Sequence, residues 1–84
     1  MIKVYSMENC PYCKDLKELL NGENIEYVDV DINLPENKEE CEIVFKMTNV
    51  DSVPIVKVGK HLLAPDVSFE SIEEAFELTK KFMV

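Results

Sequence analysis

Apolar residues recur with two different spacings along this 84-residue chain. Short runs rich in β-branched and aromatic residues are typical of strands, and apolar residues three and four positions apart are typical of amphipathic helices. The first pattern predicts strands at residues 2–6, 25–31, 53–58 and 61–63. The second pattern predicts helices at residues 11–21, 36–48 and 67–82.

Residues that start and stop helices stand near the ends of these segments. Pro11 suits the first helical position, because its fixed φ angle and missing N–H are tolerated there. Gly22 is a good C-terminal stop, and Gly59 predicts a tight turn between the last two strands. Ser71 and Glu74 have the spacing of a capping box in the last predicted helix.

The predicted elements follow one another as β-α-β-α-β-β-α. The first two strands are joined through a helix and should run parallel with a right-handed crossover, whereas the last two form a hairpin. This order predicts an α/β fold with a four-stranded mixed sheet flanked by helices on both faces. Helical spacing is shown by Leu16, Leu19 and Leu20 in the first helix and by Ile43, Val44 and Met47 in the second. The inner stripe expected for the last helix is Phe69, Ile72, Phe76 and Met83.

The length and the 46% hydrophobic content predict a single domain over residues 1–84 with a modest core. No apolar run approaches the roughly 20 residues of a membrane-spanning helix. Met1 leads directly into the first predicted strand, without the basic and apolar regions of a signal peptide. We therefore expect a cytoplasmic protein, and a monomer by default.

Acidic residues outnumber basic residues by 17 to 9, which gives a formal net charge of −8. Proteins that bind nucleic acid need a basic surface to neutralise phosphates, so this charge disfavours nucleic acid, and it also disfavours anionic membranes. The acidic residues of the second and third predicted helices are most simply a solvated surface. Attraction of a basic partner protein is the alternative.

The tetrapeptide Cys10-Pro11-Tyr12-Cys13 connects the first strand to the first helix. Cys10 is expected at the N-cap, where helix amides and the helix dipole stabilise a thiolate and lower the thiol pKa from about 8.5. Cys13 lies one turn later and can attack a mixed disulfide formed at Cys10. Pro11 stiffens the turn, Tyr12 places a ring beside the sulfur, and Lys14 adds a positive charge nearby. The spacing predicts a redox-active dithiol.

Two other uses of the cysteine pair remain open at this point. The chain's three cysteines and single histidine, Cys10, Cys13, Cys41 and His61, could nominally form a zinc site, although their spacing matches no common zinc motif. A structural pair would leave the proline and the cap without a purpose. Cys41, whose glutamate neighbours disfavour a thiolate, and His61 are interpreted as ordinary structural residues.

With this tetrapeptide and this order of elements, the chain resembles the glutaredoxin family, a minimal thioredoxin fold, over nearly its whole length. A second motif agrees, because Ser52-Val53-Pro54 resembles the family's Thr-Val-Pro. The resemblance implies a cis bond before Pro54, which would face the cysteines, and a Val53 backbone that pairs with bound peptide or glutathione. A plain edge-strand proline is the alternative, which a central strand disfavours.

The resemblance also implies a thiol–disulfide oxidoreductase. Cys10 would attack a protein disulfide or a glutathionylated cysteine, and Cys13 or glutathione would resolve the mixed disulfide. No tightly bound cofactor is implied; glutathione is the expected cosubstrate, and disulfide-containing proteins are the expected partners. A metal or iron–sulfur binding protein and a non-catalytic interaction module are alternatives that Pro11 and the intact dithiol disfavour.

The family's glutathione-binding positions are only partly kept. Met7 stands where a lysine commonly binds the glycine carboxylate, Leu63-Ala64 replaces a Gly-Gly pair, and Pro65 has no amide to donate. Asp66 matches the family's aspartate, which receives the γ-glutamyl ammonium, but it could equally cap the next helix. Because one lost charge-assisted hydrogen bond costs about 1.5–3 kcal/mol, we expect weak glutathione binding.

The Pro65-Asp66 pair and the apolar Val50 resemble instead a group of glutaredoxin-like proteins. Members of that group donate electrons to ribonucleotide reductase and are themselves reduced by thioredoxin reductase. The sequence therefore leaves two electron sources open, glutathione and thioredoxin reductase.

Overall fold

The computed structural model describes residues 1–83, and its helices and strands follow the predicted order. The strands are β1 (Ile2–Ser6), β2 (Val28–Asp31), β3 (Ile55–Val58) and β4 (His61–Leu63). The helices are α1 (Pro11–Gly22), a short 3-10 helix η1 (Pro35–Asn37), α2 (Lys38–Thr48) and α3 (Ile72–Phe82). Within residues 1–83, no helix combines the length and apolar character needed to cross a membrane.

The four strands form one mixed sheet in the order β2-β1-β3-β4. β1 runs parallel to β2, and β3 runs antiparallel to both β1 and β4. Tyr5 pairs with Val30 on one side and with Ile55 on the other, so β1 is a central strand. Gly59 has a φ angle of 60° in the turn between β3 and β4, a conformation that suits glycine. The predicted α/β class, parallel pair and hairpin are confirmed.

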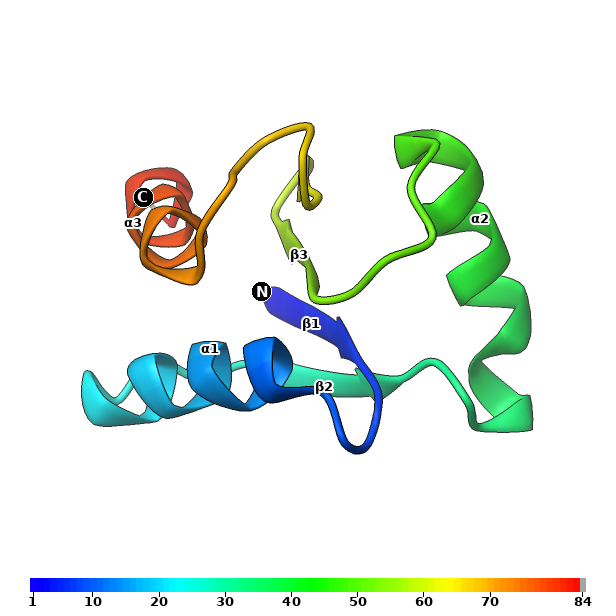
Figure 1. Cartoon of the computed structure of the whole chain (residues 1–84), viewed down its shortest axis with the longest axis horizontal. Coiled ribbons are helices and arrows are strands. Elements are labelled where there is room, and N and C mark those ends of the chain that lie inside the picture. The colour runs from blue at the N-terminus through cyan, green and yellow to red at the C-terminus, as the bar shows by residue number, and fades with distance from the viewer. Residues whose placement is uncertain (84) are drawn as a thin grey trace.

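Helices α1 and α3 cover one face of the sheet, and α2 covers the other (Figure 1). Because side chains alternate along a strand, Val4 and Val56 pack on the α1–α3 face, whereas Tyr5 and Ile55 pack on the α2 face. The larger core is completed mainly by Leu16, Leu20, Leu63, Phe69, Ile72 and Phe76. The smaller core also contains Val30, Cys41 and Val44. Helices on both faces were predicted, and this is confirmed.

Besides the third helix, three elements begin later than predicted. The strand expected from residue 25 begins at Val28, because the Ile25 amide still donates to the Leu20 carbonyl at the end of α1. The first turn of the helix expected at 36–48 is the 3-10 segment η1, so α2 itself begins at residue 38. The strand expected from residue 53 begins at Ile55, immediately after the cis Val53–Pro54 bond.

The third helix was predicted from residue 67 but begins at Ile72. Its N-cap is Ser71, whose hydroxyl accepts a hydrogen bond from the Glu74 amide at 3.1 Å. The predicted Ser71–Glu74 pair is therefore the start of this helix rather than its second turn, and Asp66 does not cap it. Phe69 precedes the helix, bridges to Pro65 and remains in the core.

Several apolar helix residues face solvent instead of the core. Ile43 is 53% exposed and Met47 71% exposed, because α2 turns Cys41 and Val44 toward the sheet. Met83 is also exposed, and it lies just beyond the end of α3. The prediction that Met83 belongs to the inner stripe of the last helix was therefore wrong, and helical spacing alone did not place Ile43 and Met47.

One carboxylate attaches α2 to the central strand. Glu40 Oε2 accepts hydrogen bonds from the Tyr5 hydroxyl at 2.7 Å and from Lys3 Nζ at 2.8 Å. These two hydrogen bonds, first from Lys3 and then from Tyr5, hold the pKa of Glu40 below its usual value. Burial, with the Glu40 carboxylate as second cause, raises the pKa of Tyr5, so the hydroxyl stays protonated and donates.

We predict that Glu40→Ala lowers the free energy of unfolding by about 1–3 kcal/mol at neutral pH, because Tyr5 loses the partner of its buried hydroxyl. The carboxyl pKa is lower in the folded state, so this contribution is present above the unfolded pKa and disappears as pH falls through the folded pKa. Urea titrations across the acidic range measure the difference between wild type and variant.

Glu39→Ala is the matched control, since Glu39 is exposed and lies in the same first turn of α2. Both substitutions remove one charge near the helix N-terminus, so the helix dipole contributes to both alike. Equal destabilisation by the two variants would contradict a specific role for the Tyr5–Glu40 contact.

Candidate active site

Cys10 is the N-cap of α1, as predicted, and its sulfur is bonded to that of Cys13. The two Cα atoms are 5.3 Å apart, within the usual range for a disulfide. The Cys13 amide, one of the free donors of the first turn, donates a hydrogen bond to Cys10 Sγ at 3.2 Å. Cys10 is 9% exposed and Cys13 only 1%, so an external sulfur reaches Cys10 more easily.

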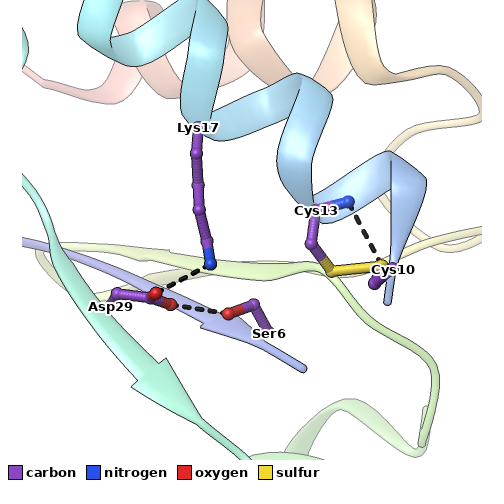
Figure 2. Close-up of a disulfide and its surroundings, with 5 residues drawn as sticks. All are labelled: Ser6, Cys10, Cys13, Lys17 and Asp29. Atoms are coloured by element: carbon purple, nitrogen blue, oxygen red, sulfur yellow. Dashed lines mark hydrogen bonds and ion pairs between the residues drawn. A yellow bond between two sulfur atoms is a disulfide. The ribbon is translucent and has the colours of Figure 1, made fainter. Parts of the chain in front are cut away.

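A polar network of Ser6, Lys17 and Asp29 lies beside the disulfide, between α1 and the sheet (Figure 2). The buried Ser6 hydroxyl donates to Asp29 Oδ1 at 2.5 Å, and Lys17 Nζ donates to Asp29 Oδ2 at 2.7 Å. Lys17 stands four residues after Cys13 and therefore lies on the same side of α1. The network ties the dithiol helix to β1 and β2.

A groove of about 330 Å³ adjoins the dithiol turn. It is lined by four residues that the sequence predicted at the site, Tyr12, Val53, Pro54 and Asp66. The Val53–Pro54 bond is cis, as predicted. No hydrogen bond within residues 1–83 uses the Val53 backbone, which lies outside the strands. The structure therefore brings the predicted substrate-binding residues together next to the cysteines.

The loop that follows β4 satisfies its own amides. The Ala64 amide donates to Ser68 Oγ at 3.1 Å, and the Asp66 amide donates to the Phe69 carbonyl at 2.8 Å. The amides of residues 67 and 68 both donate to the Ala64 carbonyl, and Pro65 has no amide hydrogen. Residues 64–68 thus offer no free backbone amide to the carboxylate of a ligand.

The charged residues that line the groove are acidic. Asp66 and Glu70 both line it, and both are exposed. Among residues 1–83, neither carboxylate forms a salt bridge, and no lysine lines the groove. Met7, at the position where the resemblance implies a lysine, is 40% exposed.

The other singled-out residues lie apart from this site. Cys41 is buried on the α2 face of the sheet, and burial, followed by the charges of Glu40 and Asp31, raises the pKa of its thiol. The His61 ring stacks on that of Phe82 with centroids 4.1 Å apart. The four residues of the nominal zinc site are therefore not brought together.

Lys14 is exposed on the first turns of α1, and its backbone amide donates to the Cys10 carbonyl at 3.0 Å. Sequence reasoning missed the Ser6–Asp29–Lys17 network and the place of Glu70 in the groove. The spacing of Lys17 from Cys13 was a usable signal for the network. No sequence signal placed Glu70 in the groove, because the helix was predicted to begin at residue 67 and the turn that contains Glu70 was not expected.

Solved structures show the class of fold. The thioredoxin-like protein BC3987 superposes with a TM-score of 0.73 at 24% identity, covering 93% of this chain and 99% of that protein. Buckwheat glutaredoxin, solved in complex with glutathione, superposes with a TM-score of 0.71 at 17% identity, covering 98% of this chain and 70% of that one. The chain has a thioredoxin fold with a cysteine pair at the start of its first helix.

Sequence comparison narrows this class. The glutaredoxin family model matches residues 2–63. An uncharacterized glutaredoxin-like 8.6 kDa protein in the rubredoxin operon of Clostridium pasteurianum is 35% identical over 63 residues, covering 75% of this chain and 81% of that protein. The chain therefore belongs to the glutaredoxin family. The family match ends at residue 63, just before the loop with satisfied amides.

We predict that only one thiol of the reduced protein reacts quickly with iodoacetamide at neutral pH, and that it is Cys10. Cys41 is 3% exposed and has a raised thiol pKa, so its reactive thiolate is scarce until the protein unfolds. Timed alkylation followed by peptide mass spectrometry identifies each site. The Cys10→Ser variant should lack the fast phase, and fast labelling of Cys41 in native protein would contradict the assignment.

Proposed function

We propose that this protein is a dithiol–disulfide oxidoreductase that reduces protein disulfides or mixed disulfides of glutathione. The observation that carries the proposal is that Cys10 Sγ, which accepts a hydrogen bond from the Cys13 amide at 3.2 Å, lies next to a second sulfur that can resolve a mixed disulfide. An N-cap position favours a thiolate over a thiol, because the helix N-terminus stabilises negative charge. Family membership supports the same reaction class.

The proposed reaction has two exchange steps. The Cys10 thiolate attacks one sulfur of the substrate disulfide, so that a Cys10–substrate disulfide forms and the other substrate sulfur leaves as a thiolate. Cys13 then loses its proton and attacks the Cys10 sulfur, which releases the second substrate thiolate and closes the Cys10–Cys13 disulfide. The substrate gains two electrons, and the protein loses two.

The Ser6–Asp29–Lys17 network supports the second step by holding α1 in place. Cys13 is nearly fully buried and has to reach Cys10 while a substrate is attached. The contacts of Lys17 with Asp29, and of Asp29 with Ser6, keep the Cys13 side of the helix against the sheet (Figure 2). Preorganised reacting groups need less reordering during the reaction.

The groove supports thioredoxin reductase as the electron source more than glutathione. Glutathione carries two carboxylates, yet no lysine of the described residues lines the groove, and the amides of residues 64–68 are occupied or absent. Only the carboxylates of Asp66 and Glu70 remain, and they suit the γ-glutamyl ammonium but not the two carboxylates of glutathione. We therefore propose a cytoplasmic redoxin that a thioredoxin reductase regenerates, with ribonucleotide reductase as one candidate electron acceptor.

We predict that Cys10→Ser lowers disulfide reduction by roughly a thousandfold or more, because the nucleophile is lost. Cys13→Ser should instead accumulate a covalent mixed disulfide with a substrate peptide, which mass spectrometry detects. Cys41→Ala serves as the control and should retain activity. If the wild-type protein reduced none of the disulfides tested, the proposed oxidoreductase function would be wrong.

A second prediction concerns the electron source, measured as NADPH consumption with one disulfide substrate. One assay contains glutathione and glutathione reductase, and the other contains thioredoxin reductase. We expect turnover mainly in the second assay. Met7→Lys should raise turnover in the glutathione assay by about tenfold through a restored charge-assisted contact, without a comparable gain in the other.

Met47→Lys is the matched control for charge, because Met47 is 71% exposed on α2, which covers the other face of the sheet. It should leave both assays unchanged. Full turnover of the wild type with glutathione alone would contradict the weight given to the missing contacts.

A further inference from the structure

Three features of the groove beside the dithiol indicate which kind of side chain it would bind. Its walls are apolar at Tyr12 and Pro54, and it adjoins the turn that carries the reactive sulfur. Its charged lining residues are Asp66 and Glu70, and neither carboxylate has an ion-pair partner within residues 1–83. An unpaired carboxylate beside an apolar wall favours a cation with an aliphatic stem.

The Val53 backbone at the edge of the groove points to a polypeptide rather than a small molecule. It lies outside the strands, and its polar groups make no hydrogen bond within the described residues. An extended chain that pairs with such a segment places its side chains at fixed spacings from the backbone. A side chain next to the target cysteine then extends into the groove.

We propose that the groove binds a lysine or arginine side chain adjacent to the disulfide-bonded cysteine of a target polypeptide, with Asp66 and Glu70 as its counter-charges. This inference rests on the proposed oxidoreductase function and specifies its substrate class. The satisfied amides of residues 64–68 and the acidic lining disfavour an anionic neighbour of the cysteine. Like charges brought together in this way slow association.

The test uses three peptides of the form X-Cys-X, in which both X residues are lysine, glutamine or glutamate. Each cysteine carries a 2-thiopyridyl group in disulfide linkage. The reduced protein is mixed with each peptide, and the release of thiopyridone follows the first exchange. Cys10 becomes bonded to the peptide cysteine, thiopyridone leaves with the electron pair, and Cys13 then releases the peptide thiol. No reductase is needed.

We expect the lysine peptide to react about tenfold faster than the glutamate peptide at low ionic strength, with glutamine between them. Added salt should shrink the ratio, because it screens exposed charges. Asp66→Asn/Glu70→Gln should bring the ratio close to one. Asparagine suits the φ angle of 63° at residue 66, so the loop conformation is retained.

Glu26→Gln/Glu42→Gln is the matched control, because it removes two exposed carboxylates that do not line the groove. It should keep the lysine preference. If this control also loses the preference, the inference is overturned, because the overall net charge of −8 rather than the groove would then attract the lysine peptide. A preference that persists in Asp66→Asn/Glu70→Gln would overturn the roles of the two carboxylates.

The neutral glutamine peptide separates the two proposals. If the fully reduced wild type fails to react with all three peptides, the oxidoreductase function itself is overturned. If it reacts with the glutamine peptide but equally fast with the lysine and glutamate peptides, only the substrate preference is overturned.

Discussion

The position of α1 against the sheet is the constraint on which the chemistry of this molecule depends. Leu16 and Leu20 are fully buried, and burying such a side chain contributes about 1.5–3 kcal/mol. Lys17 adds a hydrogen bond and ion pair to Asp29 on β2. These contacts fix the helix N-terminus at the end of β1, so the chain must enter the helix at Cys10. The N-cap role of that residue follows from the packing of the helix behind it.

Much of this arrangement could be predicted from the sequence, because its signals are local. Pro11 and the Cys-Pro-Tyr-Cys spacing mark the start of α1, and a short run of β-branched and aromatic residues marks β1. The errors arose where tertiary contacts decide. Ile43 and Met47 fit a helical stripe, yet only one side of α2 can meet the sheet, and Cys41 and Val44 occupy it.

In the candidate site, too, local motifs were predictable from the sequence and the features set by the folded backbone were not. The cysteines and Pro54 stand in recognisable motifs, whereas the groove depends on the conformation of residues 64–70. There the backbone amides donate hydrogen bonds to carbonyls of the same turn, and Asp66 adopts a φ angle of 63°. Periodicity extended the last helix across this segment, so it did not indicate that Glu70 lines the groove. Charge placement in a turn is set by backbone geometry that no pattern of apolar residues encodes.

The third cysteine of the chain, Cys41, is buried beneath α2. The sheet separates this thiol from the Cys10–Cys13 pair, because α1 and α2 lie on opposite faces (Figure 1). In the folded chain, Cys41 therefore cannot form a disulfide with Cys10 or Cys13 by intramolecular thiol–disulfide exchange. If the Cys10–Cys13 pair works as we propose, it exchanges electrons two at a time, and the native fold keeps the third sulfur out of that exchange.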